Sequence, residues 1–471
     1  MHLLELPLEI FHAILAHAIP RDNSSRYDFT QLQLVNKTFA REAREVLFAT
    51  HTLKGIPAWP HLFAGYLCHR ALAPDASVYY AIRTVRQTTD WIAAQLAITD
   101  WQARHKICHS LSQLATCQYR AIVRMTLTES AHGFSMREKT QGLDQVSDAS
   151  MHRLSAAAYL GNMALVQTLL DQGADVNEES HVLGRPLTGA AYGGHLSVVQ
   201  LLVERGADVS GGALQWKAET EGRDGNLWMI TRSSNQIRSA LEAATAAGHE
   251  PIVDLLLEPS LGISRSSFTF FAAMVQAAQG GHQNMLQSLF DRADFNAVAE
   301  ELKERVLDAA VRESASNGHL ETLKFLLDAG APVDLVISER HEQGPLWNAA
   351  INGQNGAVEM LLARGADINE RSLRPRSSPL VVAAETGFPR TVALLLDRGA
   401  EVNDNKGVRP LRYISTFAPW CVWKVFLQKG IHKRDEEAAV DVLEDAYKDN
   451  RQDLVDLLLE YGVTLSQEAV E

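Results

Sequence analysis

The sequence predicts an all-helical fold, in which an N-terminal helical head and a helical cap precede a solenoid of helix–turn–helix repeats. Similar blocks recur from about residue 150 onward, and within them apolar residues recur at helical spacing. A glycine follows the leucine-rich stretch of each clear block. Gly173 and Gly206 are 33 residues apart, Gly330 and Gly365 are 35 apart, and Gly365 and Gly399 are 34 apart. One block cannot bury its apolar face alone, so the blocks must stack.

Composition limits the classes of function. The chain has 471 residues, of which 46% are hydrophobic and 21% are charged, as in a folded protein. Its net charge of −13 argues against nucleic acid or anionic lipid as a general partner. Four scattered cysteines form no disulfide framework, and we find neither a secretory signal nor the roughly 18 apolar residues of a membrane span. We expect an intracellular protein of the cytoplasm, the nucleus or both.

Four blocks show the repeat most clearly, and they span residues 153–177, 185–210, 344–369 and 378–403. Three looser blocks begin near Ser239, Phe270 and Val306, and degenerate copies lie near Arg409 and Glu437. We therefore expect the solenoid to occupy residues 151–466, with about nine repeats. The polar, glycine-containing residues 133–150 are expected to form a linker.

Each block predicts two helices joined by a turn. A proline occupies the first helical turn, where it costs no hydrogen bond, and a pair of alanines then allows close approach between helices. A glycine turns the chain into a second, leucine-rich helix, and another glycine ends that helix in a left-handed cap. The prolines are Pro186, Pro345, Pro379 and Pro410, the turn glycines are Gly194, Gly248, Gly318, Gly353 and Gly387, and the caps are Gly206, Gly365 and Gly399.

This period of about 33 residues, with these motifs, resembles the ankyrin repeat over about two-thirds of the chain. The resemblance implies a protein-binding solenoid. We expect partner contacts on one concave face, at the variable first-helix positions before each turn glycine, and at the tips between repeats. The first-helix positions are Tyr192, Gly193, Gln279, Ser316, Asn317, Ile351, Asn352, Glu385 and Thr386, and the tips are Glu178, Arg371 and Lys406.

An insertion interrupts the register at residues 210–236 and contains Trp216, Trp228 and Met229. Insertions in repeat proteins form loops on one face, so this one either packs back on the stack or contacts a partner. A second loop, residues 370–377, is rich in arginine and is either a solvated tip or a contact for an acidic partner. His195, His249, His282 and His319 follow turn glycines in separate repeats, too far apart to share a metal ion, so we expect hydrogen-bonded turn histidines.

Residues 1–50 resemble the F-box, a three-helix module. The matching pattern is Leu-Pro-x-Glu-Ile at residues 6–10, Ile-Leu at 14–15, Leu-x-x-Val-Asn at 32–36, an aromatic at Phe39 and Leu-Phe at 47–48. In that family the module binds the Skp adaptor of cullin ubiquitin ligases. The resemblance implies adaptor contacts by Leu6, Pro7, Glu9, Ile10, Ile14, Leu15, Leu34 and Val35. The insert at residues 20–29 is longer than the family's usual turn, and the alternative role is a domain that caps the solenoid.

Residues 51–132 are helical but not repetitive, and we expect them to cap the stack. His105 and His109 lie one helical turn apart, with Cys117 further on, but a third histidine and a catalytic glutamate are lacking. No phosphate-binding glycine loop, nucleophile elbow or Cys-x-x-Cys pair is present. We therefore expect no enzyme activity, no catalytic residues, no cofactor and no metal.

Two functions remain open. In the first, the chain is a substrate receptor, as in the fungal F-box/ankyrin proteins it resembles: the head recruits a cullin ubiquitin ligase and the repeats select a protein. In the second, it is a regulatory scaffold or transcription coregulator that binds a transcription factor, as similar fungal ankyrin proteins do, some of them for a secondary-metabolite gene cluster. Both imply protein partners, no direct contact with nucleic acid or membrane, and a chain that is monomeric by itself.

Overall fold

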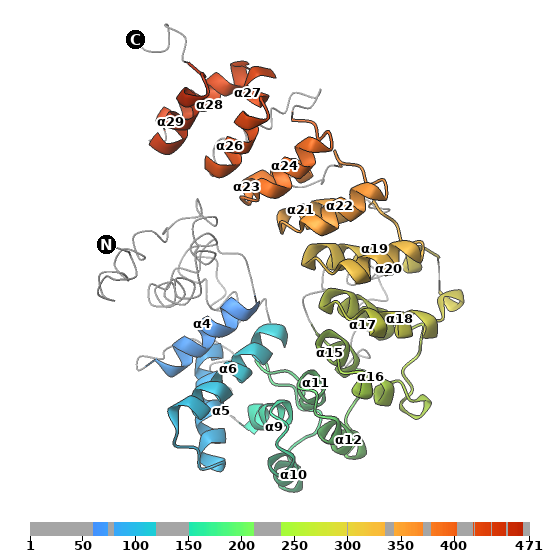
Figure 1. Ribbon diagram of the computed structural model, residues 1–471. Coiled ribbons are helices and arrows are strands. Elements are labelled where there is room, and N and C mark those ends of the chain that lie inside the picture. Colours follow the sequence, from blue (N-terminus) through green and yellow to red (C-terminus); the bar gives the residue numbers. More distant parts are fainter. Residues whose placement is uncertain are drawn as a thin grey trace, which may run out of the picture. The chain divides into compact units, whose positions relative to one another are not determined.

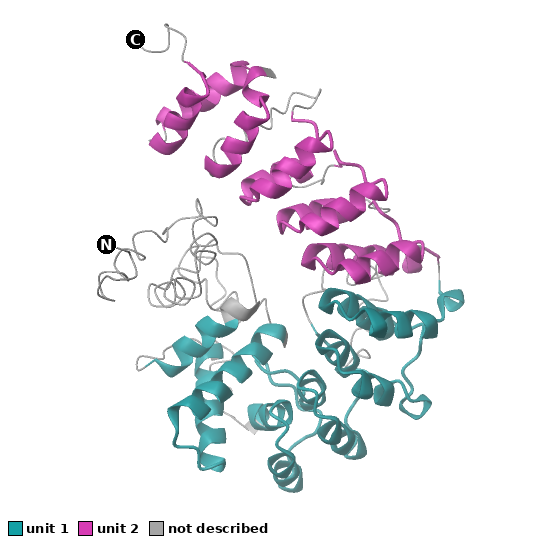
Figure 2. Ribbon diagram, viewed as in Figure 1, with its two compact units in different colours: residues 1–23, 32–299 teal, residues 24–31, 300–471 magenta. Residues whose placement is uncertain are grey.

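The computed structural model describes two compact units, each of which is presented by itself (Figures 1 and 2). The first unit is described up to residue 298 and the second from residue 300 onward. The described residues are 60–73, 80–118, 150–211, 237–298, 300–334, 343–370, 378–402, 418, 420–434, 436–448 and 451–464. The F-box-like head, residues 133–149 of the predicted linker, the insertion beyond Gly211 and the loop 371–377 lie outside these ranges, whereas Ser150 belongs to a helix.

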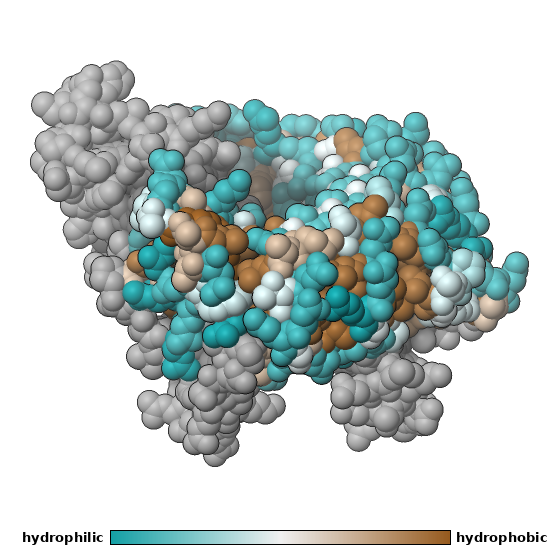
Figure 3. Space-filling model, turned by 90° about the horizontal axis from the view of Figure 1, so that it is seen from below, coloured by the Kyte–Doolittle hydropathy of each residue, from teal (hydrophilic) through white to brown (hydrophobic). Residues whose placement is uncertain are grey.

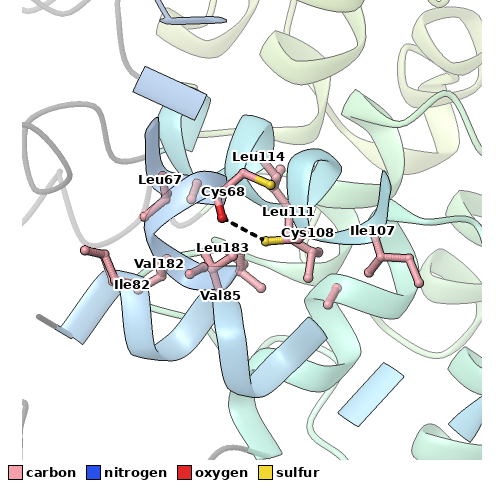
Figure 4. Packing of buried hydrophobic residues seen from close by; sticks show 14 of the residues in the cluster. Leu67, Cys68, Ile82, Val85, Ile107, Cys108, Leu111, Leu114, Val182 and Leu183 are labelled. Carbon is pink, nitrogen blue, oxygen red and sulfur yellow. Dashed lines mark hydrogen bonds between the residues drawn. The ribbon is translucent and has the colours of Figure 1, made fainter. Parts of the chain in front are cut away.

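Three helices that are not repeats pack together at the start of the first unit: α4 (Pro60–Leu72), α5 (Tyr80–Gln95) and α6 (Trp101–Gln118). Their buried faces form a cluster around Leu67, Ile82 and Leu111, and the Cys108 thiol donates a hydrogen bond to the Cys68 carbonyl oxygen at 3.7 Å (Figure 4). Val182 and Leu183, which belong to the repeats, complete this cluster. The three helices therefore share a core with the first repeats.

Helix pairs form the rest of the first unit, as the repeated blocks predict. They are α9 (Ser150–Tyr159) with α10 (Met163–Asp171), α11 (Pro186–Tyr192) with α12 (Leu196–Glu204), α15 (Ala240–Ala247) with α16 (Glu250–Leu256), and α17 (Phe268–Gly280) with α18 (Gln283–Arg292). The short 3-10 turns η3 (Pro259–Leu261) and η4 (Phe295–Ala297) follow α16 and α18. The first helices of neighbouring repeats pack side by side, and so do the second helices α10, α12 and α16.

The second unit repeats this arrangement. Its pairs are α19 (Glu300–Asn317) with α20 (Leu320–Asp328), α21 (Pro345–Ile351) with α22 (Asn355–Ala363), and α23 (Pro379–Glu385) with α24 (Pro389–Asp397), followed by α26 (Trp420–Gln428), the short α27 (Ile431–Arg434), α28 (Glu436–Lys448) and α29 (Gln452–Glu460). The second helices α20, α22, α24 and α26 pack in succession, and α26 also packs against α29. No helix in the described ranges combines the length and apolar content that crossing a bilayer requires.

The ends of these helices follow the predicted signals. Pro186, Pro345 and Pro379 are first helical residues, each preceded by a residue with extended backbone. A proline fits there because its missing N–H would have no partner inside the helix. Gly206, with a φ of 88°, takes the left-handed conformation after its second helix, and Gly365 and Gly399 do the same. These starts and caps are confirmed, whereas the predicted start at Pro410 lies outside the described residues.

Alanines let the first helices approach closely. Ala190 and Ala191, Ala349 and Ala350, and Ala383 and Ala384 are all fully buried between neighbouring first helices. The second helices present Val199, Leu202 and their equivalents to the same core. Because an alanine methyl group is small, it allows the main chains of neighbouring first helices to come close together.

Within each unit, a turn contact joins successive repeats. The side chain after the turn glycine of one repeat lies over the turn glycine of the repeat before it, and in the first unit its ring N–H donates to a carbonyl oxygen there. His195 Nε2 donates to Tyr159 O at 3.0 Å, His249 Nε2 to Tyr192 O at 3.2 Å and His282 Nε2 to Ala246 O at 3.2 Å. In the second unit Gln354 Nε2 donates to Ser316 O at 3.4 Å. The predicted structural role is thereby confirmed for these three histidines.

A second link lies at the tips. The Asn177 side chain accepts from Asp208 N at 2.7 Å and donates to Gly206 O at 3.1 Å. Asn369 likewise accepts from Glu401 N at 2.9 Å. The asparagine that ends each Asp-x-Asn turn therefore binds the main chain of the following repeat, so both ends of the helix pair are tied to a neighbour.

We expect Gly194→Ala to destabilise the chain more than Gly206→Ala. Both glycines have positive φ, so each alanine costs about 1–2 kcal/mol of backbone strain. A Cβ at Gly194 would lie 2.5 Å from the His249 ring, whereas a Cβ at Gly206 meets nothing within 4 Å. Overpacking should add about 1–3 kcal/mol at Gly194 alone. Urea unfolding followed by circular dichroism measures both losses.

The same experiment has an internal control. Adding His249→Ala to Gly194→Ala frees the space above the turn, so the double variant should lose less than the sum of the single changes. Equal losses for Gly194→Ala and Gly206→Ala would contradict a close contact between the imidazole and the glycine.

Candidate functional site

The last turn of each first helix places two side chains at the same point in successive repeats. In the second unit these residues are Ser316 and Asn317 at the end of α19, Ile351 and Asn352 at the end of α21, and Glu385 and Thr386 at the end of α23. The two residues before each pair are buried, whereas the pair itself is half-buried or exposed. The predicted positions therefore reach the surface in three successive repeats.

Two of these positions meet across a repeat boundary. Asn352 Nδ2 donates to Ser316 Oγ at 2.9 Å and to Asn348 O at 3.0 Å. Asn317 Nδ2 donates to Glu313 O at 2.8 Å, and both asparagines are exposed. Each amide keeps an oxygen that can accept further hydrogen bonds. The α19 and α21 ends thus form a continuous polar strip.

The α23 end extends the same series with a different chemistry. Thr386 Oγ1 donates to Val382 O at 2.6 Å, which leaves the hydroxyl oxygen as an acceptor. Burial raises the pKa of Glu385. A carboxylate that is partly withdrawn from water binds a donor more strongly than a fully solvated one does.

Tyr192 is engaged within the first unit. Its hydroxyl lies 3.0 Å from Cys117 Sγ, its ring stacks on Tyr159 with centroids 6.2 Å apart, and burial raises the pKa of its phenol. The sequence places Tyr192 on the partner-binding face, but in the structure its side chain packs against the non-repeat helices. Gly193 is close to the main chain of the preceding repeat, because a Cβ there would lie 2.5 Å from Tyr159 O.

The remaining predicted residues are distributed as follows. Gln279 is half-buried at the end of α17, and Glu178 is half-buried in the loop after α10. Arg371, Lys406 and all eight adaptor-binding residues of the F-box-like head lie outside the described residues.

Sequence reasoning missed a buried acid at Glu242. Its carboxylate accepts from Arg238 N at 3.2 Å and from Ser239 Oγ at 3.1 Å, while Ser239 Oγ accepts from Glu242 N at 3.1 Å. Burial raises the pKa of Glu242 to about 7, although these hydrogen bonds oppose the shift. The signal was present, because Ser-x-x-Glu before an apolar helix is a capping box.

Glu370 is a second acid with a raised pKa, and it lies half-buried at the base of α21. Its Oε1 accepts from Trp347 N at 2.7 Å, so it caps the start of that helix. The pKa of Glu370 is raised to about 7, mainly by burial. The Trp347 hydrogen bond opposes this rise, and the negative charges of Asp334, Asp367 and Asp308 contribute to it. No local sequence signal identifies it, because Glu370 and Trp347 are 23 residues apart.

The histidine pair of α6 joins no larger ligand set among the described residues. The His105 and His109 rings stack with centroids 6.4 Å apart, and Trp101 lies 5.0 Å from His105. In the ranges that the structure describes, no three His, Cys, Asp or Glu side chains are grouped so as to hold a metal ion.

The helix pairs, the turn contacts and the glycine caps define a repeat protein that is built from stacked helix–turn–helix units. Residues 154–268, 274–372 and 346–469 match the family described as Ankyrin repeats (3 copies), and together they span more than half of the chain. The chain belongs to the ankyrin-repeat family, which confirms that resemblance.

Several proteins are similar over the repeats. Ankyrin repeat and KH domain-containing protein mask-1 of Caenorhabditis elegans is 35% identical over 105 residues, which are 21% of this chain and 4% of that protein. The probable E3 ubiquitin-protein ligase XBOS32 of Oryza sativa subsp. japonica is 28% identical over 163 residues, 29% of this chain and 32% of that protein. The E3 ubiquitin-protein ligase XB3 of the same organism is 37% identical over 93 residues, 20% of each chain. This chain thus spans about a third or less of the length of these relatives.

Among solved structures, the ankyrin repeat domain of human ASB11 aligns with a TM-score of 0.35 and 21% sequence identity. The alignment covers 53% of this chain and 98% of that domain.

We expect Glu242→Gln to reduce the pH dependence of stability. The folded-state pKa of about 7 lies above the ordinary value of 4.5, so the folded protein holds this proton more tightly than the unfolded chain does. Its stabilising contribution is complete below about pH 4.5 and is lost as the pH rises through about 7, a change of at most about 3 kcal/mol. The urea midpoint should therefore fall less between about pH 5 and about pH 8 in the variant than in the wild type.

Glu204→Gln supplies the matched control, because Glu204 is exposed at the end of α12. It should leave the pH dependence of the wild type unchanged. Identical pH dependences for Glu242→Gln and the wild type would contradict a raised pKa at this position.

Proposed function

We propose that this chain is a non-catalytic adaptor whose ankyrin repeats capture a partner protein through the ends of their first helices. One observation carries the proposal. Before each of the turn glycines Gly318, Gly353 and Gly387, two positions hold small buried residues, whereas the next two positions hold Ser-Asn, Ile-Asn and Glu-Thr and reach the surface. A purely structural role would select the same residue each time, so this variation favours a binding role.

The chemistry of the strip suits a polar peptide segment. Asn317 and Asn352 are exposed amides that donate and accept hydrogen bonds, as a peptide backbone does. Ile351 lies half-buried beside them and supplies an apolar contact, while Glu385 supplies an acceptor for a basic side chain. Rigid helix ends lose little entropy on binding, which favours affinity.

We further propose that residues 1–50 recruit the Skp adaptor of a cullin ubiquitin ligase, so that the captured protein becomes a substrate. The Leu-Pro-x-Glu-Ile motif at residues 6–10 and the later apolar pattern support this role. Two relatives over the repeats are described as E3 ubiquitin-protein ligases, which is compatible with repeats of this kind serving ubiquitin transfer.

The capture surface is tested by charge insertion. Ser316→Arg with Asn352→Arg should remove the partner that co-purifies with the wild-type chain, because two large cations would fill the strip between α19 and α21. Glu359→Arg, on the exposed face of the second helix α22, is the matched control and should retain it. Quantitative mass spectrometry of the co-purified proteins measures both. Loss with Glu359→Arg but not with the strip variant would place the binding face elsewhere.

The head is tested by its own motif. Leu6→Ala with Pro7→Ala should abolish co-purification of the Skp adaptor, because both residues belong to the docking segment that the F-box resemblance implies. Leu8 occupies the variable position x of the Leu-Pro-x-Glu-Ile motif, so Leu8→Ala should leave co-purification of the adaptor unchanged. Circular dichroism should show unchanged helix content in all variants, since repeats depend mainly on their neighbours. Wild-type chain that brings down no adaptor would favour the capping role of the head and the regulatory-scaffold function.

A further inference from the structure

Residues 420–434, which span α26 and α27, are basic, whereas the chain as a whole is acidic. Residues 420–434 contain Lys424, Lys429, Lys433 and Arg434 and no aspartate or glutamate, in a chain with a net charge of −13. Lys429 is neutralised by Asp397 of the preceding second helix. Among the described residues, no ion pair involves Lys424 or Lys433, and both are exposed. Lys424 and Lys433 are therefore exposed cations without an ion pair in the described ranges, although Glu436 and Glu437 follow closely in the sequence.

An exposed tryptophan lies beside this charge. Trp420 is the first residue of α26 and is 49% exposed, while Val422, Trp423 and Phe426 on the other face are buried. Lys424 follows one helical turn later on the same face. Side chains of a helix lean toward its N-terminus, so the Lys424 side chain leans toward Trp420.

The same two positions of other second helices have different chemistry. They hold Glu250 and Asp254 in α16, Asn355 and Glu359 in α22, and Gln452 and Asp456 in α29. The nearest equivalent is Leu320 with Lys324 in α20, where Glu321 and Asp328 on the same helix oppose the lysine. Hydrophobic and hydrophilic residues are interspersed on the face that Figure 3 shows. In α26 an exposed aromatic residue and an exposed lysine that forms no ion pair with the described residues occur one helical turn apart.

We propose that the exposed face of α26, with Trp420, Lys424 and the adjacent Lys433, is a docking site for an acidic segment of another protein that carries an apolar anchor residue. Tryptophan is enriched among the residues that dominate binding energy, and a half-exposed ring leaves apolar area to cover. The lysines attract carboxylates and increase the rate of association. This site lies on a second helix, so it is separate from the strip on the first helices and extends the proposed function.

The test uses the full-length chain and a short fluorescein-labelled peptide in which glutamates alternate with leucine and phenylalanine. Fluorescence polarisation should show saturable binding that weakens as salt is added, because the contribution of exposed charges is screened. Trp420→Ala and Lys424→Glu should each weaken binding by at least about tenfold. Lys324→Glu, at the equivalent exposed position of α20, should leave affinity unchanged, and so should Ser316→Arg with Asn352→Arg.

Three results would overturn the proposal: wild-type affinity in both α26 variants, equal binding of a peptide with lysine in place of every glutamate, or binding only to vesicles that contain phosphatidylserine. The last result would identify an anionic membrane surface instead. Circular dichroism of Trp420→Ala confirms the fold, and Lys424→Glu provides an independent measurement because an exposed lysine has little structural role. If Ser316→Arg with Asn352→Arg retained the co-purified partner, the proposed capture surface would be wrong, but the proposal for the α26 site would be unaffected.

Discussion

The contact between one residue and the turn glycine of the preceding repeat constrains how successive repeats stack within each unit. An imidazole lies flat over a position that has no Cβ, and its N–H satisfies a carbonyl oxygen that the end of the first helix leaves without an internal partner. Because the ring has a fixed thickness, the contact sets the separation of neighbouring helix pairs. Alanine is the side chain that fits between first helices at that separation, which explains the buried alanine pairs of the described repeats.

The side chain still covers the turn glycine at a turn where it cannot donate a hydrogen bond. In the second unit Gln354 occupies the histidine position and still donates to the preceding repeat, whereas Phe388 at the next turn has no N–H to donate. The Phe388 ring nevertheless lies so close to Gly353 that a Cβ there would come within 2.4 Å. Covering the glycine is therefore the common requirement, and the hydrogen bond is an addition in most turns. With spacing secured in this way, the two residues before the glycine are free to vary, and they are the ones that we assign to partner capture.

The sequence was informative where a residue acts within its own repeat. Prolines at helix starts, left-handed glycine caps and alanine pairs each reflect a local backbone requirement, and the structure contains them where they were predicted. Partners from distant elements were not accessible to this reasoning. Tyr192 contacts Cys117, which is 75 residues away, and this contact was not predicted because nothing near Tyr192 signals that helix. Glu370 was missed for the same reason, whereas the capping box of Glu242 was local and could have been recognised.

The turn contact also has a direction. The earlier repeat supplies only a glycine and a carbonyl oxygen, and the later repeat supplies the side chain that fits them. A chain leaves the ribosome N-terminus first, so each newly made helix pair emerges with the group that docks onto the pair already formed. When a histidine of a new repeat emerges, the glycine and the carbonyl oxygen that it contacts have already been synthesised. The order of synthesis is therefore compatible with stacking that proceeds from the N-terminus, and a chain that is truncated after a complete repeat ends in an uncovered glycine rather than in an unpaired histidine.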